Sequence, residues 1–312
     1  MLRIRLPVMG VPVEFETDAP LVRDAVESAL GSWRFLEHRP ELVSPSARTA
    51  PRVSLRLAHQ DGTASDRVTV SSPAPGRLEL SGAGVSGSAN GELLSASCTI
   101  TPSVLRDRYL FEETVLPSLV LNLTTNLDRQ PLHASAVRRR TQTLLLHGRS
   151  GTGKSTLAYA ALRNGWHVLS DDAVFLQSSP RLRIWARAQR LHLPPEATVY
   201  FPELADRPLV RRQNAKWKLW VEPPASWPAA LRPAEHATLC LLERGSGEPD
   251  ARRIPGESAV RSVLDSLDPG FDLFRETIGP VLRTLVGDHA WIVRTAPDPR
   301  RTAAVLDQLV AT

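Results

Sequence analysis

The sequence predicts an α/β chain in two parts: a smaller β-rich α+β domain over residues 1–128, and an α/β domain with a mixed sheet over residues 129–312. Three observations support this. The 312 residues suffice for two ordinary domains with real cores. The first part is built of short runs in which apolar and polar residues alternate. In the second part, strand-like runs alternate with helical segments, which is the pattern of an α/β domain.

Strand patterns dominate the first part, with Gly, Pro, Ser and Asp between them. We expect strands over residues 1–15, 52–60, 67–72, 77–82 and 93–100. Helical periodicity predicts helices over residues 19–36 and 107–127, the second of which leads into the second part. No His, Cys or acidic residues cluster here at ligand spacing, so the sequence assigns this part no chemistry.

The second part begins at "PLHASAV", residues 131–137, and continues with a strand at 143–148, a helix at 153–165 that Gly165 ends, and a strand at 166–172. Further strands are expected over residues 173–177, 181–193, 217–222, 237–244 and 290–296, with a closing helix at 299–311. The stretch 194–235 is rich in Pro and Arg, and we interpret it as long functional loops.

The composition excludes several classes of protein. Apolar residues make up 42% and charged residues 23%, which are globular values. The net charge is +5, but the arginines are scattered and aromatics reach only 5%, so we expect no nucleic-acid partner. No apolar run approaches the roughly 20 residues that cross a bilayer, and the start has no signal-peptide core, so we expect no membrane and a cytoplasmic location. Cys98 and Cys240 show no metal-type spacing and predict no disulfide framework.

One motif carries strong chemical information. "GRSGTGKS" fits the pattern G-x-x-x-x-G-K-[ST] in full and lies between a strand and a helix, as that pattern requires. The glycines let the chain wrap so that successive N–H groups point at phosphate oxygens, and the helix start adds positive charge there. Lys154 would reach the β- and γ-phosphates, and the Ser155 hydroxyl would bind Mg²⁺. The predicted cofactor-binding residues are Gly148, Arg149, Ser150, Gly151, Thr152, Gly153, Lys154, Ser155 and Thr156.

Two neighbouring carboxylates, Asp171 and Asp172, end the strand after that helix. Side chains of adjacent strand residues diverge, so one can face Mg²⁺ while the other faces an incoming hydroxyl. A carboxylate within hydrogen-bond reach can take the proton of such a hydroxyl. The alternative is a pair of turn-forming acids on the surface.

Lysine is rare, with three against 35 arginines. A site that keeps lysine needs a compact ammonium rather than a planar fork, so Lys216 and Lys218 join Lys154 as candidates. Two exposed lysines on a strand are the alternative interpretation.

The pattern "HASAV…LLLHGRSGTGKST…GWHVLSDDAV" resembles the bifunctional HPr kinase/phosphorylase family, bacterial serine kinases whose fold is related to phosphoenolpyruvate carboxykinase. It resembles still more the broader HPr-kinase-like set, which includes kinases that tailor lasso peptides. The resemblance is specific over residues 131–176. It implies that Asp171 is the general base for an acceptor serine and that Asp172 helps Ser155 hold Mg²⁺.

The same resemblance implies roles for four more residues. His133 would lie near the phosphate or orient an aspartate, and a histidine that merely starts a strand is the alternative. The transferring phosphoryl group would be reached by Arg190, Lys216 and Lys218. Thr156 stands where the true HPr kinases carry a glutamate, and their Gly-rich second signature is not visible.

Together these observations predict an ATP- and Mg²⁺-dependent kinase that transfers the γ-phosphoryl group to a serine of a protein or peptide. Two alternatives are kept: an ATPase or GTPase switch whose acceptor is water, and a non-catalytic nucleotide sensor. The sequence names neither the acceptor nor the oligomeric state, and a homo-oligomer is left open.

Overall fold

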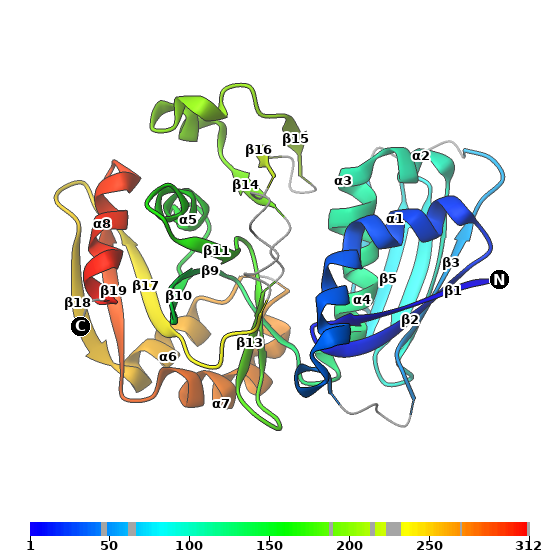
Figure 1. The fold of residues 1–312 in the computed structure, drawn as a ribbon, viewed down its shortest axis with the longest axis horizontal. Helices are drawn as coiled ribbons and strands as arrows, with labels where there is room; N and C mark the ends of the chain where they lie inside the picture. The colour runs from blue at the N-terminus through cyan, green and yellow to red at the C-terminus, as the bar shows by residue number, and fades with distance from the viewer. Residues whose placement is uncertain are drawn as a thin grey trace. The chain divides into compact units, whose positions relative to one another are not determined.

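The structure is a computed structural model, and it describes residues 1–44, 49–61, 67–186, 190–212, 216–222, 232–268 and 270–310. The chain divides into two compact units, Met1–Arg129 and Gln130–Thr312 (Figure 1). The boundary between the units lies one residue after the position expected from the sequence, which was between residues 128 and 129. The expected α/β class with mixed sheets is confirmed.

The unit Met1–Arg129 contains a seven-stranded sheet. Its order is β1 (Leu2–Val8), β2 (Val11–Thr17), β3 (Arg52–Leu57), β7 (Ser95–Ile100), β6 (Val85–Asn90), β5 (Arg77–Gly82) and β4 (Thr69–Ser71). The single strand expected over residues 1–15 is wrong, because Met9 (φ 50°) and Gly10 (φ 74°) form a tight turn that folds β2 back on β1. Two residues with positive φ match the twist of a two-residue hairpin.

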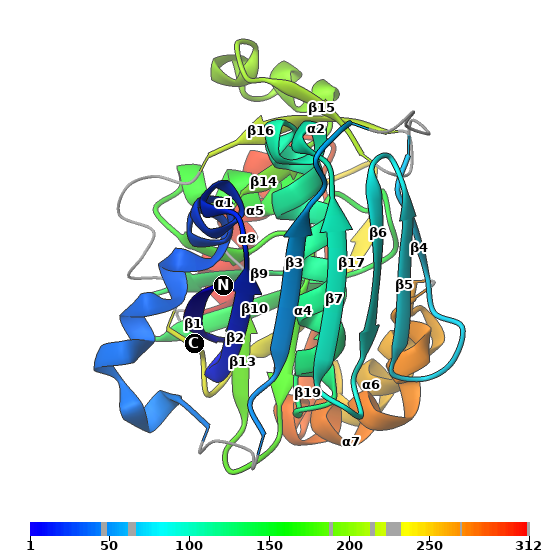
Figure 2. The ribbon, with the colours of Figure 1, turned by 90° about the vertical axis from the view of Figure 1, so that its right-hand side faces the viewer.

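Both helices expected in this unit are confirmed, although each is segmented. The first comprises α1 (Pro20–Leu30) and the 3₁₀ segment η1 (Gly31–His38). The second comprises α3 (Arg108–Leu110), a π-helical turn η3 (Phe111–Val115) and α4 (Leu116–Thr125), with the short α2 (Pro102–Arg106) before it. α1 packs on β1 to β3, and α4 packs on β5 to β7, as seen from the sheet side in Figure 2.

The unit Gln130–Thr312 is built on a six-stranded mixed sheet. Its order is β11 (His167–Ser170), β9 (Ala134–Arg139), β10 (Gln142–His147), β17 (Thr238–Arg244), β19 (His289–Thr295) and β18 (Asp250–Pro255). β10, β17 and β19 are parallel, so their carboxyl ends meet at one edge. In open α/β sheets, ligands bind outside such an edge.

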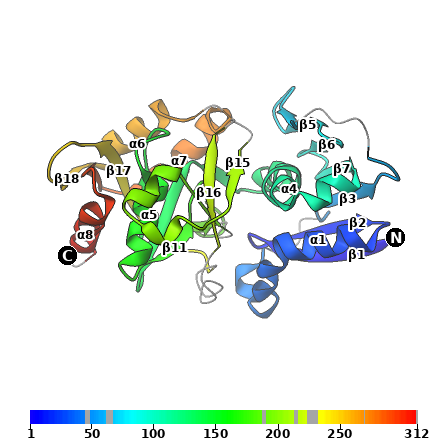
Figure 3. The ribbon, with the colours of Figure 1, turned by 90° about the horizontal axis from the view of Figure 1, so that it is seen from above.

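Helices cover both faces of this sheet (Figure 3). α5 (Lys154–Arg163) and α8 (Pro299–Leu309) lie on one face and pack on each other. α6 (Gly256–Asp265) and α7 (Arg275–Val286) lie on the other. The helices at 153–165 and 299–311 were expected, whereas α6 and α7 were not, although the face of α6 that packs on the sheet buries Ala259, Val260 and Val263 at helical spacing.

Two three-stranded sheets flank the main one. The first has the order β13 (Arg183–Ala186), β12 (Val174–Gln177), β8 (Gln130–Leu132), and the second β14 (Leu191–Leu193), β16 (Trp217–Val221), β15 (Leu209–Arg211). The single strand expected over 181–193 is therefore wrong: β13 and β14 belong to different sheets, and residues 187–189 lie outside the described residues. β16 confirms the strand expected over residues 217–222. The rest of the expected loop region 194–235 also holds β15 and two 3₁₀ turns, η4 (Pro195–Val199) and η5 (Pro202–Leu204).

Among the helices of the described residues, none has the length and apolar character needed to span a membrane.

Candidate functional site

The glycine-rich loop lies between β10 and α5, where the motif predicted it. β10 ends at His147, and α5 begins at Lys154. Gly151 (φ 90°) and Gly153 (φ 94°) adopt left-handed backbone conformations that L side chains rarely take. At Gly148 the reason for glycine is space instead, because an added Cβ would lie 2.8 Å from the Thr152 Oγ1 atom. Backbone geometry and packing thus both require glycine in this loop.

Lys154 is buried, with 6% of its surface exposed, and its ammonium points back into the loop. Its Nζ donates to the carbonyl oxygens of Gly148 at 2.6 Å and Arg149 at 3.4 Å. Burial lowers the pKa of Lys154, while the carboxylates of Asp268 and Asp172 favour the charged form. A cation held by two neutral carbonyls is poised to take a stronger anionic partner, such as a phosphate.

The loop opens into a pocket of about 1000 Å³. Four groups of residues line it: the loop with the start of α5, a set of charged side chains near Asp172, residues of β14 and η4, and the carboxyl ends of β17 and β19 with the start of α8. The predicted site residues in the lining are His133, Ser150, Gly151, Thr152, Gly153, Lys154, Ser155, Thr156, Asp172, Lys216 and Lys218. Gly148 and Arg149 contribute their carbonyl oxygens to Lys154 instead.

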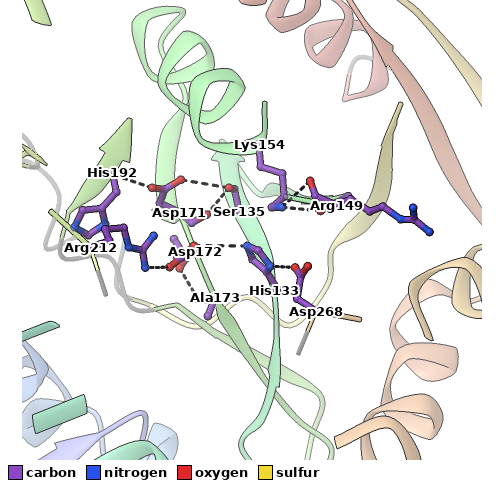
Figure 4. A network of polar contacts seen from close by, with 12 residues as sticks. His133, Ser135, Arg149, Lys154, Asp171, Asp172, Ala173, His192, Arg212 and Asp268 are labelled. Atoms are coloured by element: carbon purple, nitrogen blue, oxygen red, sulfur yellow. Dashed lines mark hydrogen bonds and ion pairs between the residues drawn. The ribbon is translucent and has the colours of Figure 1, made fainter. Parts of the chain in front are cut away.

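Asp171 lies beneath the pocket rather than in its lining, with 4% of its surface exposed. Its Oδ2 accepts the backbone N–H of His192 at 2.8 Å, and its Oδ1 lies 3.5 Å from the Ser135 hydroxyl (Figure 4). Burial raises the pKa of Asp171 to about 6, the charge of Asp172 adds to this, and hydrogen bonds from His192 and Ser155 oppose it. The carboxylate therefore occupies a position behind Ser155, turned away from the open pocket.

Asp172, by contrast, faces the pocket, and half of its side chain is exposed. Its Oδ2 accepts from the Arg212 guanidinium at 2.7 Å, and its Oδ1 lies 3.6 Å from the His133 Nε2 (Figure 4). Desolvation on its recessed side would raise the pKa of Asp172, but the contacts with His133 and Arg212 outweigh it and hold the pKa well below its usual range. Asp172 is thus an ionised carboxylate at neutral pH.

His133 is held from three sides. Its Nδ1 donates to the Asp268 carboxylate, and its Nε2 faces Asp172. The ring stacks on Phe271 with a centroid distance of 5.4 Å and an interplanar angle of 21°. The carbonyl oxygen of His133 contacts the Nδ1 atom of His147 at 3.0 Å. Because these contacts fix the ring, His133 presents its Nε2 atom to Asp172 in the pocket.

All three lysines of the chain line this one pocket. Lys216 and Lys218 come from the segment that leads into and forms β16, and Arg212 lies just after β15. Burial lowers the pKa of Lys218, while the charge of Asp171 opposes the shift. The structure therefore brings together the side chains that the scarcity of lysine had indicated.

Arg190 lies elsewhere. Its guanidinium is 4.4 Å from the ring centroid of Trp220, its Nε lies 3.4 Å from the Glu222 carboxylate, and it does not line the pocket. Stacking on an aromatic face and an ion pair account for this position. The expectation that Arg190 reaches the transferring phosphoryl group receives no support from this placement.

Three residues of the site carry no signal in the sequence. Asp268 is 135 positions from His133, so no spacing could have paired them, and Phe271 lies in the same turn region. Arg212 is one of 35 arginines and carries no distinguishing pattern. These residues can be recognised as part of the site only from the folded structure, which brings the strand ends and loops together.

Within the described residues, no group of three or more His, Cys, Asp or Glu side chains could hold a metal ion by itself. A cation in this pocket would therefore need ligands from a bound phosphate compound as well. The Ser155 hydroxyl lines the pocket, and Asp171 lies behind it. Hydroxyl and carboxylate oxygens are hard ligands that suit Mg²⁺, so the residues present fit that ion.

Comparison with known proteins yields little. No protein-family model matches the chain, and no curated protein matches it either. Among solved structures, the HPr(Ser) kinase/phosphatase from Coxiella burnetii is similar over 59% of this chain and 97% of its own, with 13% sequence identity and a TM-score of 0.31. This is a weak link at the level of the fold alone.

Proposed function

We propose that this protein is an ATP- and Mg²⁺-dependent kinase that transfers the γ-phosphoryl group to a serine hydroxyl of a protein or peptide. The observation that carries the proposal is a single pocket lined by the glycine-rich loop, all three lysines and the ionised carboxylate of Asp172. The loop motif supports nucleotide binding. The choice of serine follows the resemblance over residues 131–176.

Positive charge in the pocket is arranged for phosphoryl transfer. Lys154 and the loop amides would neutralise the β- and γ-phosphates, and Lys216 and Lys218 line the same pocket. Arg212, now paired with Asp172, adds a planar guanidinium that suits phosphate oxygens. Fixed cations aimed at the transferring group stabilise the charge spread over its oxygens in the transition state.

The two aspartates divide their work differently from what the resemblance implies. We assign Asp172 to the acceptor side, because it alone of the pair faces the pocket, with His133 beside it. Asp171 is assigned to the metal side, because it is buried behind Ser155. Asp172 would accept the hydrogen bond of the serine hydroxyl and orient it, which suits a carboxylate whose pKa is low.

Mg²⁺ would be held by the Ser155 hydroxyl and the phosphates of the nucleotide, with Asp171 orienting that hydroxyl from behind. When bound, the ion neutralises charge between the β- and γ-phosphates. The protein's own contribution is to keep Ser155 in place. The backbone N–H of His192 and the Ser135 hydroxyl hold Asp171, and so serve the same end.

The test is phosphotransfer from Mg·ATP to candidate peptides and proteins, read by mass spectrometry. Wild type is compared with Lys154→Ala and Asp172→Asn, each expected to lower transfer by about a hundredfold or more. Asp250→Asn is the matched control, because Asp250 is an exposed carboxylate paired with Arg294 outside the pocket lining. Its transfer should equal wild type.

Three results would contradict the proposal in different ways. ATP consumed with no acceptor modified would favour a hydrolysing switch, and ATP bound but never consumed would favour a sensor. Equal loss in all three variants would remove the site assignment. Asp171→Asn separates the aspartates: it should raise the Mg²⁺ concentration needed for half-maximal transfer, whereas Asp172→Asn should lower the maximal rate at saturating Mg²⁺.

A further inference from the structure

The pocket continues past the phosphate loop on the side away from Asp172. Sheet order establishes this, because β10, which leads into the loop, lies between β9 and β17. His133 and Asp172 adjoin β9 and β11 on one side of β10. On the other side, Arg244 ends β17, Thr295 ends β19, and both line the pocket. A ligand whose phosphates occupy the loop therefore has room for a further group at the β17–β19 end.

Arg244 is the distinctive residue at that end. It is exposed, and no described residue makes a hydrogen bond, an ion pair or a ring contact with its guanidinium. Two other cations near the loop are engaged: Arg212 with Asp172, and Lys154 with two carbonyls. A planar guanidinium without a carboxylate partner is suited to stack on the face of a flat aromatic ring.

The walls beside Arg244 also suit a flat heterocycle. Pro297 and Pro299 supply rigid apolar surface, and Ser246 and Thr295 supply hydroxyl groups. Among the described residues that line this end, from β17, β19 and α8, none carries a carboxylate. Glu248, which is close in sequence, is paired with Arg301.

The absence of a carboxylate from these lining residues bears on which purine base, adenine or guanine, this end of the pocket can bind. Guanine presents two N–H donors on its Watson–Crick edge that a buried site satisfies best with a carboxylate, whereas adenine presents one amino group and ring acceptors. Hydroxyls and backbone groups suffice for adenine. The chemistry of this end therefore favours adenine.

We propose that Arg244, with Ser246, Thr295 and the proline wall, forms the nucleobase subsite: Arg244 stacks on the base, and the hydroxyl groups, with no carboxylate beside them, favour adenine. This inference rests on the proposed function, because the phosphates must occupy the loop. It adds what the loop motif leaves undecided, namely which base is bound and by which side chain.

The experiment measures the affinity of Mg²⁺ complexes of ATP, GTP and inorganic tripolyphosphate by titration calorimetry. Arg244→Ala should weaken ATP about tenfold and leave tripolyphosphate within about twofold of wild type, because only ATP has a base. Arg244→Lys should weaken ATP by a similar factor, since an ammonium lacks the planar face. Wild type should bind ATP about tenfold more tightly than GTP.

The matched control is Arg253→Ala, an exposed arginine of β18 outside the pocket lining, which should bind both ligands as wild type does. Equal weakening of ATP and tripolyphosphate by Arg244→Ala would show that Arg244 binds phosphate and would overturn the inference. So would an unchanged ATP affinity, or a preference for GTP.

Lys154→Ala separates failure of the inference from failure of the proposed function. If it abolishes binding of both ATP and tripolyphosphate while Arg244→Ala changes neither, the phosphate loop works and the base subsite is wrong. If wild type binds neither compound, the proposed function fails, and the base subsite fails with it.

Discussion

Acidification is expected to weaken the unit Gln130–Thr312 through His147, the residue that ends β10 just before the phosphate loop. His147 is 3% exposed, its Nδ1 lies 3.0 Å from the His133 carbonyl oxygen, and its Nε2 lies 3.1 Å from the Ser266 hydroxyl. Burial lowers the pKa of His147 from 6.5 to about 4, although the contact with the His133 carbonyl opposes the shift. The folded protein therefore keeps this histidine neutral.

The sign and size of the effect follow from that pKa. Above pH 6.5 neither state binds the proton, and the stability is fully present. As the pH falls below 6.5, His147 becomes protonated in the unfolded chain but stays neutral in the folded chain. The free energy of unfolding therefore decreases by about 1.4 kcal/mol per pH unit. The loss is about 2 kcal/mol by about pH 5 and about 3 kcal/mol once the pH reaches the folded pKa.

The assay is urea unfolding at about pH 7.5 and about pH 5, followed by tryptophan fluorescence. Six of the seven tryptophans lie in residues 130–312, so the signal reports mainly on this unit. His147→Gln cannot ionise, so it should lose about 2 kcal/mol less than wild type between the two pH values. Asp171, whose pKa is raised to about 6, acts in the opposite sense over the same range, but it is present in both proteins and cancels.

His167→Gln is the matched control, because His167 starts β11 with its side chain exposed. It should follow the pH dependence of wild type. If His147→Gln loses as much stability as wild type on acidification, then His147 is not held neutral in the folded state and the reasoning is refuted.

Three further predictions concern the site and its support. Asp268→Asn should lower kcat for phosphotransfer about tenfold or more and leave KM for ATP within about twofold of wild type. The reason is that the substitution weakens the hold on the His133 imidazole but removes no contact of the glycine-rich loop. A rise in KM with an unchanged kcat would contradict this. Gly151→Ala and Gly165→Ala each force alanine into a positive φ and should each cost about 1–2 kcal/mol of stability, but only the first should weaken binding of ATP, as measured by calorimetry. The Nε1 atom of the buried Trp166 donates to the Asp307 carboxylate at 2.7 Å. Asp307→Ala leaves this N–H without that partner and should lower the free energy of unfolding by about 1–3 kcal/mol. Unchanged urea unfolding would contradict this.

Local patterns predicted much of the fold. The strand, glycine loop and helix at 143–165 depend on hydrophobic periodicity and on glycines with positive φ, which are properties of neighbouring residues. The errors arose where tertiary context decides. The hairpin of β1 and β2 depends on a turn at Met9 and Gly10 that carries no strong turn dipeptide, and β13 and β14 separate because they join different sheets.

The site shows the same division. From the sequence alone came the phosphate loop, the pair of aspartates and the three lysines, because a motif with fixed spacing and a rare residue type can both be recognised along the chain. Only the tertiary structure decided which aspartate faces the pocket. The partners that bury Asp171, the His192 N–H and Ser135, are 21 and 36 positions away, and Asp268 joins His133 across 135 positions. Where a side chain at a strand end points depends on what packs around it, and those neighbours come from distant parts of the chain.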